Sequence, residues 1–412
     1  MTAAPFSRRM PSAPSLALGN LRAVVILLVL SFHSVLAYLN FLPAAPFAFD
    51  RPPYLWRAFP IVDSERWFGF DLYCAWQDVF LMSLFFFLSG LFVWPSLRRK
   101  GAPLFLRDRV FRLGLPFALA VGLLMPVAQY PTYLQTADDP GLGAYLRHWL
   151  ALPFWPCGPM WFLGLLLAAD LAAATFYELA PRWHLFVTRA ATLADTRPAR
   201  FLAVLAIGSA LAYSALALVF GPSPWGQWGP FSVQLSRPAH YALYFFAGVA
   251  AGKSGLDGPL FAADGLLARC WTVWLGAAAA SFLLWLGLTG LVMHSAGGAT
   301  LGLRIADYLS FAAACFASCF LVLAVILRFG ARRSPVLESL GVNAYGMYLV
   351  HYLFVVWLQY ALLGAALPAV VKGAVVFAGT LVASWGSTAG WHTLAPLLHS
   401  FTAGRARSPA AS

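Results

Sequence analysis

The sequence predicts an all-α polytopic membrane protein: a bundle of about ten transmembrane helices with both termini in the cytoplasm. Two observations lead to this class. Of the 412 residues, 61% are hydrophobic and only 10% are charged, whereas soluble domains carry about 25% charged residues. The Lys and Arg residues also gather in short clusters between long apolar segments, as in loops retained on the cytoplasmic side. This clustering argues against nucleic acid as the partner of a chain whose net charge is +12.

Ten apolar segments approach or exceed the roughly 20 residues that a membrane-spanning helix needs. In chain order they are 17–39, 76–97, 110–129, 160–180, 201–220, 239–253, 270–293, 304–328, 341–363 and 369–392. The sixth is the shortest. Together they predict one transmembrane domain over 17–392, preceded by a cytoplasmic segment (1–16) and followed by a cytoplasmic tail (393–412).

The distribution of positive charge gives the orientation. Most of the 27 Lys and Arg residues lie in every second segment between the apolar spans, and therefore on one side of the membrane. Arg22 lies inside a span. The positive-inside rule therefore places both termini in the cytoplasm, and the multi-pass topology predicts the inner or plasma membrane of a cell. The 5 cysteines show no metal-ligand spacing, so we expect neither a disulfide framework nor a metal site.

Two long loops are expected on the outer side. Residues 40–75 are rich in Pro and aromatic side chains and include Asp63 and Asp71. A loop of this length either covers an active-site mouth or forms a lid with no chemistry of its own. The second loop, 130–159, has room for an interfacial helix.

Arg22 and His33 are the unusual residues of the first span. Ionisable side chains at membrane depth are costly, so they mark candidate functional sites. On an ideal helix, their separation places them about 20° apart in azimuth and about 16 Å apart along the axis. The face that they share is expected to point into protein. The alternatives are an arginine that snorkels to the interface and a histidine that a neighbouring helix satisfies.

The second and third spans carry weaker signals. Ser89 and Gly90 form a small pair among Phe and Leu residues, which favours close helix packing over a functional role for Ser89. Arg109 and Arg112 are three residues apart at the cytoplasmic start of the third span, where two guanidiniums suit a phosphate. Topological charge or binding of anionic lipid explains them equally well.

The later spans add further candidates. Trp161 opens the fourth span, and Asp170 inside it is a candidate partner for Arg22 or His33, or faces a water-filled crevice. In the ninth span, Tyr345, Tyr348 and His351 lie on roughly one flank, which is expected to face the bundle interior. His240, at the entrance of the sixth span, is expected to be an interface residue.

These pieces together resemble the integral-membrane acyltransferase-3 family. The resemblance lies in Arg22 with His33, FFFLSG at 85–90, Arg109-Val-Phe-Arg112, WFL at 161–163 and YLVH at 348–351. They cover nearly the whole chain in the order of the family, and the proline after RxxR is present as Pro116. The WFL, YFFAG and NAYxxYLVH stretches look most like the branch related to the succinyltransferase of osmoregulated periplasmic glucans.

The resemblance implies an acyl-CoA-dependent O-acyltransferase. It would move an acyl group, acetyl or succinyl, from cytoplasmic acyl-CoA to a hydroxyl of a carbohydrate or other cell-envelope acceptor, with the lipid bilayer as its environment and no permanently bound cofactor. His33 would act as general base, a role that suits the pKa of histidine, and Arg22 would orient the donor. Arg109 and Arg112 would hold CoA phosphates. The remaining candidates would support the site or bind the acceptor: His351, Tyr348, Trp161, Asp170 and Ser89.

Two other functions compete with acyl transfer. In a proton- or anion-coupled secondary transporter, Arg22, His33, Asp170 and His351 would form a relay, but no inverted repeat is apparent. A lipid-binding scaffold would explain the basic clusters and leave His33 without a role. Whether an acyl-enzyme forms or transfer is direct stays open at this point.

Overall fold

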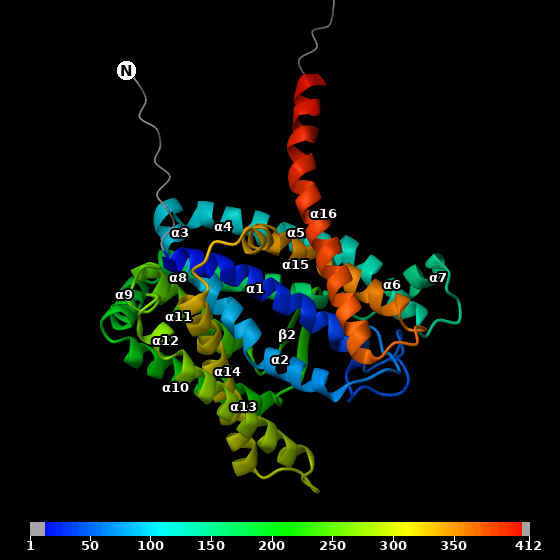
Figure 1. Cartoon of the computed structure of the whole chain (residues 1–412), viewed down its shortest axis with the longest axis horizontal. Helices are drawn as coiled ribbons and strands as arrows, with labels where there is room; N and C mark the ends of the chain where they lie inside the picture. The colour runs from blue at the N-terminus through cyan, green and yellow to red at the C-terminus, as the bar shows by residue number, and fades with distance from the viewer. Residues whose placement is uncertain (1–12, 406–412) are drawn as a thin grey trace, which may run out of the picture. The chain divides into compact units, whose positions relative to one another are not determined.

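The computed structural model describes residues 13–405, which are mostly helical with almost no sheet (Figure 1). The α-helices, in chain order, are α1 (Ala13–Val35), α2 (Phe68–Gly90), α3 (Val93–Lys100), α4 (Ala102–Arg109), α5 (Leu115–Leu119), α6 (Met125–Leu134), α7 (Leu142–Leu150), α8 (Trp161–Leu179), α9 (Pro181–Thr196), α10 (Pro198–Phe220), α11 (Pro238–Ser254), α12 (Leu266–Arg269), α13 (Trp271–Met293), α14 (Leu301–Phe329), α15 (Pro335–Ala361) and α16 (Ala369–Arg405).

Shorter elements connect these helices. The π-helical segments η3 (Val110–Gly114) and η4 (Ala120–Leu124) join α4, α5 and α6 into one helical run. The 3-10 helices are η1 (Leu36–Tyr38), η2 (Leu55–Arg57) and η5 (Gly158–Met160). Within the described residues the sheet is a single antiparallel hairpin of β1 (Trp225–Trp228) and β2 (Phe231–Gln234).

Nine helical runs among residues 13–405 are long and apolar enough to cross a membrane, against the ten expected. The difference is the segment 239–253, which folds as α11 but spans only 17 residues. Several ends also differ from expectation: α2 begins at Phe68 rather than at 76, the third run begins at Ala102 rather than at 110, and α16 continues to Arg405 rather than ending at 392. Residues 1–12 of the expected cytoplasmic N-terminal segment and 406–412 of the tail lie outside the described residues.

The helices form two compact units. The first unit combines residues 13–21, 75–117 and 161–334 of the described chain. Helix α14 is at its centre and packs against α10, α12 and α13. More than half of the apolar window of α14 is buried in the protein, whereas only 6% of the corresponding window of α13 is buried. Helix α13 therefore presents most of its apolar surface outward, as a lipid-facing helix does.

Glycines bring two helices of the first unit close together. A Cβ on Gly90 of α2 would meet the backbone carbonyl of Phe245, and a Cβ on Gly248 of α11 would meet that of Phe87. The backbones of α2 and α11 can approach this closely only because both positions lack a side chain. The close packing predicted from the Ser89-Gly90 pair is thus confirmed, and Gly90 is the residue that makes the contact.

The second unit combines residues 22–74, 118–160 and 335–405 of the described chain. Helix α15 packs against α6 and α16. Phe49 and Trp56 of the first long loop pack with Tyr133 and Tyr145 in one buried aromatic cluster, and Tyr145 lies on α7, which occupies the room foreseen for a helix in the second loop. Burial raises the pKa of the Tyr145 hydroxyl well above its usual range.

A buried ion pair anchors the first long loop. The Nζ atom of Lys372 on α16 lies 3.0 and 2.8 Å from the two carboxylate oxygens of Asp63. Both side chains are almost fully buried. The backbone N–H of Asp63 also donates to the carbonyl of Ala37, just beyond the end of α1. The loop is therefore fastened both to α16 and to the end of the helix that carries His33.

Candidate active site

His33 and His351 form a pair in the second unit. His33 lies in the last turn of α1 and is half-buried, whereas His351 lies inside α15 and is fully buried. The two imidazole rings are 5.0 Å apart between centroids. The Nε2 atom of His351 is 3.3 Å from Nδ1 of His33. Two spans far apart in the sequence thus bring their histidines into contact.

Two backbone carbonyls determine the protonation of both rings. Nδ1 of His351 lies 2.6 Å from the carbonyl oxygen of Tyr348, and Nδ1 of His33 lies 2.9 Å from that of Val29. A carbonyl oxygen only accepts hydrogen bonds, so each Nδ1 carries the proton and donates. Nε2 of neutral His351 is then an acceptor for the His33 Nδ1–H. By elimination, the lone pair of neutral His33 is on Nε2, which is the arrangement that a general base requires.

Gln359 of α15 fixes the end of the helix that carries His33. Its Nε2 amide donates to the carbonyl oxygens of His33 (2.9 Å) and Ser34 (3.1 Å). The last carbonyls of an α-helix have no partner within the helix, and α1 ends at Val35. The buried amide satisfies two of these carbonyls and so holds the backbone of His33 in place.

Tyr352 packs against the histidine pair. Its ring lies edge-on to His33, 5.6 Å between centroids. Gly158 has a φ of +50°, and a Cβ there would meet Met125 and the Tyr352 ring. Glycine is therefore needed for this turn both by its conformation and by its close contact.

Tyr348 has a structural contact in the same region. Its hydroxyl donates to the backbone carbonyl of Pro159 in η5, and its own carbonyl accepts from His351. Tyr348 thus ties the turn before α8 to α15 at the level of the histidine. Of the predicted polar flank, Tyr348 and His351 are buried as expected, whereas Tyr345 is 42% exposed.

In the first unit, the partner of Asp170 is Arg109. The Nε atom of Arg109 lies 3.2 Å from Oδ2 of Asp170, whose side chain is 1% exposed. The guanidinium also lies over the ring of Phe105, 4.8 Å from its centroid. Arg22 and His33 were the expected partners of Asp170. The carboxylate of Asp170 on α8 is instead paired with Arg109, which lies at the end of the neighbouring helix α4.

Arg112 lies in different surroundings from Arg109. It is exposed and belongs to the π-helical segment η3, which begins directly after Arg109. The wider turn of a π-helix rotates Arg112 away from its place on a regular α-helix, and such turns are frequent at functional sites. One arginine is therefore held by a buried carboxylate and the other faces outward.

The structure places the remaining predicted site residues as follows. Arg22 lies within α1 and is exposed, although its face was expected to point into protein. Ser89 is half-buried in α2, next to the close approach at Gly90. Trp161 opens α8 and contacts the rings of Trp225 and Tyr241. Within residues 13–405 no group of three or more His, Cys, Asp or Glu side chains is arranged to hold a metal ion.

Sequence reasoning missed several polar residues of these two regions. Tyr352 directly follows the YLVH motif, and Gln359 is a lone amide two turns further along an apolar span. Asp78 is a carboxylate inside an apolar segment, and its partner Arg237 directly precedes another. Polar side chains within apolar spans were the signal that would have identified them.

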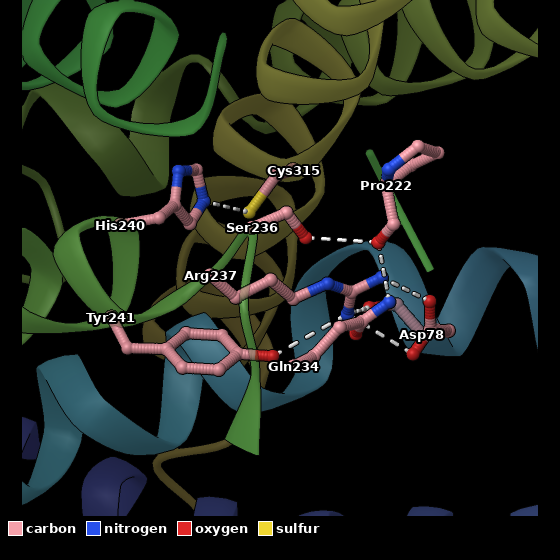
Figure 2. A network of polar contacts seen from close by, with 8 residues as sticks. All are labelled: Asp78, Pro222, Gln234, Ser236, Arg237, His240, Tyr241 and Cys315. Atoms are coloured by element: carbon pink, nitrogen blue, oxygen red, sulfur yellow. Dashed lines mark hydrogen bonds and ion pairs between the residues drawn. The ribbon is translucent and has the colours of Figure 1, made fainter. Parts of the chain in front are cut away.

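Asp78 and Arg237 belong to a polar network in the first unit (Figure 2). The Arg237 Nη1 atom donates to the backbone carbonyl of Asp78 (3.0 Å), and both terminal nitrogens contact the Asp78 carboxylate. Near them, His240 is buried and lies 3.3 Å through Nε2 from Sγ of Cys315 and 3.2 Å through Nδ1 from the carbonyl of Ser209. His240 of α11 is thus buried against α10 and α14.

Comparison with known proteins gives one family. The family model described as an acyltransferase domain matches residues 16–389, which is nearly the whole chain and includes both the histidine pair and the Arg109–Asp170 pair. No curated protein and no solved structure matches the chain.

Proposed function

Because the chain belongs to the acyltransferase-3 family through its domain at 16–389, we propose that it is a membrane-embedded O-acyltransferase that uses acyl-CoA as its donor. The family establishes a multi-pass membrane acyltransferase. The proposal adds an acetyl or succinyl group as the cargo, a hydroxyl of a carbohydrate or other cell-envelope molecule as the acceptor, and the inner or plasma membrane as the location. The termini are proposed to be cytoplasmic, in line with the positive-inside rule.

The geometry of His33 is the observation that supports this chemistry best. Its Nδ1–H is directed at the Val29 carbonyl and at Nε2 of His351, which leaves Nε2 as the basic nitrogen. When Nε2 takes up a proton, the imidazolium still donates through Nδ1 to two acceptors. Such an arrangement orients a base and stabilises its charged form, as the third member of a catalytic triad does.

The proposed reaction is direct transfer. The acceptor hydroxyl gives its proton to Nε2 of His33 while its oxygen attacks the thioester carbonyl carbon of acyl-CoA. The carbon–sulfur bond of the tetrahedral intermediate then breaks, and the CoA sulfur leaves with the proton that His33 returns. One ester forms, one thioester is cleaved, and His33 ends in its initial state.

The two arginines are proposed to hold the phosphates of CoA. Arg109 contacts Asp170 through Nε, which leaves its terminal nitrogens for a bidentate contact with phosphate. Asp170 would hold that guanidinium in a fixed orientation. Arg112, exposed on the π-helical segment, would supply a second positive charge. Arg22 would orient the donor from its exposed position on α1.

The central test is transfer of a radiolabelled acetyl group from acetyl-CoA by the purified protein in detergent micelles. His33→Ala should lower kcat by about 10²- to 10⁴-fold, the usual contribution of a general base, with an unchanged unfolding temperature. His33→Gln should be similarly inactive. Full activity of a folded His33→Ala protein would refute the assignment.

A test of the donor site needs a variant that does not leave a buried charge without its partner. Arg109→Ala alone would leave the buried Asp170 carboxylate without its cation, and loss of a buried partner costs about 3–5 kcal/mol. The double variant Arg109→Gln/Asp170→Asn removes both charges and should fold, yet bind CoA more weakly in isothermal titration. Arg112→Ala should weaken CoA binding without the second substitution. Unchanged CoA affinity in both variants would remove the phosphate role.

A further inference from the structure

The hairpin between α10 and α11 has two chemically different faces. Directly paired residues of an antiparallel hairpin share a face, and successive residues alternate. Trp228 pairs with Phe231, and these two side chains form an apolar face: Phe231 stacks on Phe117, 5.3 Å between centroids, and the Trp228 ring lies over Gly226. The opposite face carries Trp225 and polar side chains.

The mixed face is polar apart from one tryptophan. Trp225 pairs with Gln234, and Gln227 pairs with Ser232. Two amides, a hydroxyl and one indole thus share this side of the hairpin. Trp225 is 43% exposed, and Trp228 and Phe231 of the apolar face are 61% and 50% exposed, so both faces are accessible.

This face continues into the buried arginine at the start of α11. The backbone N–H of Arg237 donates to the carbonyl of Gln234, and its guanidinium grips Asp78 (Figure 2). The side chain of Arg237 is 6% exposed, whereas that of Asp78 is 49% exposed. The cation is therefore enclosed and the carboxylate is held in a fixed orientation at the surface.

Aromatic contacts connect these residues into one continuous patch. The Trp161 ring lies 5.6 Å from that of Trp225 and is stacked 6.0 Å from that of Tyr241. The hydroxyl of Tyr241 in turn accepts from Nη1 of Arg237 at 3.4 Å. We call this contiguous set the hairpin patch: Asp78, Trp161, Trp225, Gln234, Arg237 and Tyr241.

We propose that the hairpin patch is the docking site of a neutral carbohydrate acceptor. An exposed indole offers a flat apolar face with large contact area, against which the C–H face of a sugar ring packs. An oriented carboxylate accepts strong hydrogen bonds from hydroxyl groups, and the Gln234 amide, whose Nε2 donates to the Pro222 carbonyl (2.7 Å), can accept through its oxygen. A few polar groups beside aromatic side chains are the usual composition of a small-molecule site.

The charges of the patch argue for a neutral ligand. Arg237 is engaged by Asp78 through both terminal nitrogens, so the pair is close to neutral and its exposed part is the carboxylate. An anionic ligand such as a phosphate would meet the exposed negative group and be disfavoured. The apolar face with Trp228 is the one suited to the bilayer interface, where tryptophan is common.

The inference rests on the proposed transfer to a hydroxyl, and it is tested by binding without any donor. The protein is reconstituted in lipid nanodiscs and titrated with three neutral pentasaccharides, namely laminaripentaose, maltopentaose and cellopentaose, while saturation-transfer-difference NMR reports binding. At least one should bind the wild-type protein. Trp225→Ala should weaken that binding on the order of tenfold or more, as truncation of a central aromatic contact does.

The matched control is Trp228→Ala, which removes an equally large ring from the opposite face of the same hairpin and should leave saccharide binding unchanged. Binding is measured without acyl-CoA, so a protein that binds a saccharide but transfers no acyl group separates this inference from the proposed chemistry. Binding of none of the three saccharides to the wild type would overturn the proposal. Equal binding by Trp225→Ala and Trp228→Ala would overturn it as well.

Discussion

The ion pair between Asp63 and Lys372 gives the sharpest test of the second unit. Both side chains are buried to 1% exposure or less, and Lys372 contacts both carboxylate oxygens. Lys372→Met leaves a buried carboxylate without its cation, and Asp63→Asn leaves a buried ammonium group. Each single change should cost about 3–5 kcal/mol of stability, because desolvation of the remaining charge is no longer compensated.

The double variant Asp63→Asn/Lys372→Met should be more stable than either single variant, since two neutral groups of similar size replace two charges. The assay is thermal unfolding in detergent, with acyl transfer as a second readout because Asp63 also binds the Ala37 carbonyl beyond α1. Asp50→Asn serves as control, since its pair with Arg51 is exposed, and it should change stability by less than about 0.5 kcal/mol. Additive losses in the double variant would refute the reasoning.

Three further substitutions test the packing and the site. Gly248→Ala places a Cβ against the Phe87 carbonyl and should lower the unfolding temperature by an amount that corresponds to at least about 1–3 kcal/mol. The control Gly276→Ala, with open space around its Cβ, should be neutral or slightly stabilising. Equal effects of the two variants would contradict this account. Gln359→Leu removes the donor to two carbonyls at the end of α1 and should cost about 1–3 kcal/mol; hydrogen exchange that stays as slow as in wild type at residues 36–39 would argue against that role. Tyr348→Phe removes the bond to Pro159 and should reduce kcat less than His33→Ala does, measured by acetyl transfer; an equal loss would make Tyr348 a direct participant.

The sequence could identify single residues of the candidate site but not the residues they contact. His33 and His351 stood out because ionisable groups are rare in apolar spans, and their contact is what the structure adds. Asp170 stood out for the same reason, but its partner was misjudged. Spacing along one helix says which side chains share a face and says nothing of which neighbouring helix presents the opposite charge. Arg109 fulfils that role because α4 packs against α8.

The sequence by itself determined the class of protein, the approximate position of nearly every span and the family, because hydropathy and ordered motifs are local properties of the chain. It also indicated which residues carry costly charge. Only the tertiary structure decided how those residues are paired, since hydrogen bonds between distant helices depend on packing that no local pattern encodes. The tautomer of His33 is the clearest case: two backbone carbonyls and a second histidine fix it, and these groups come together only when α1 and α15 have folded side by side.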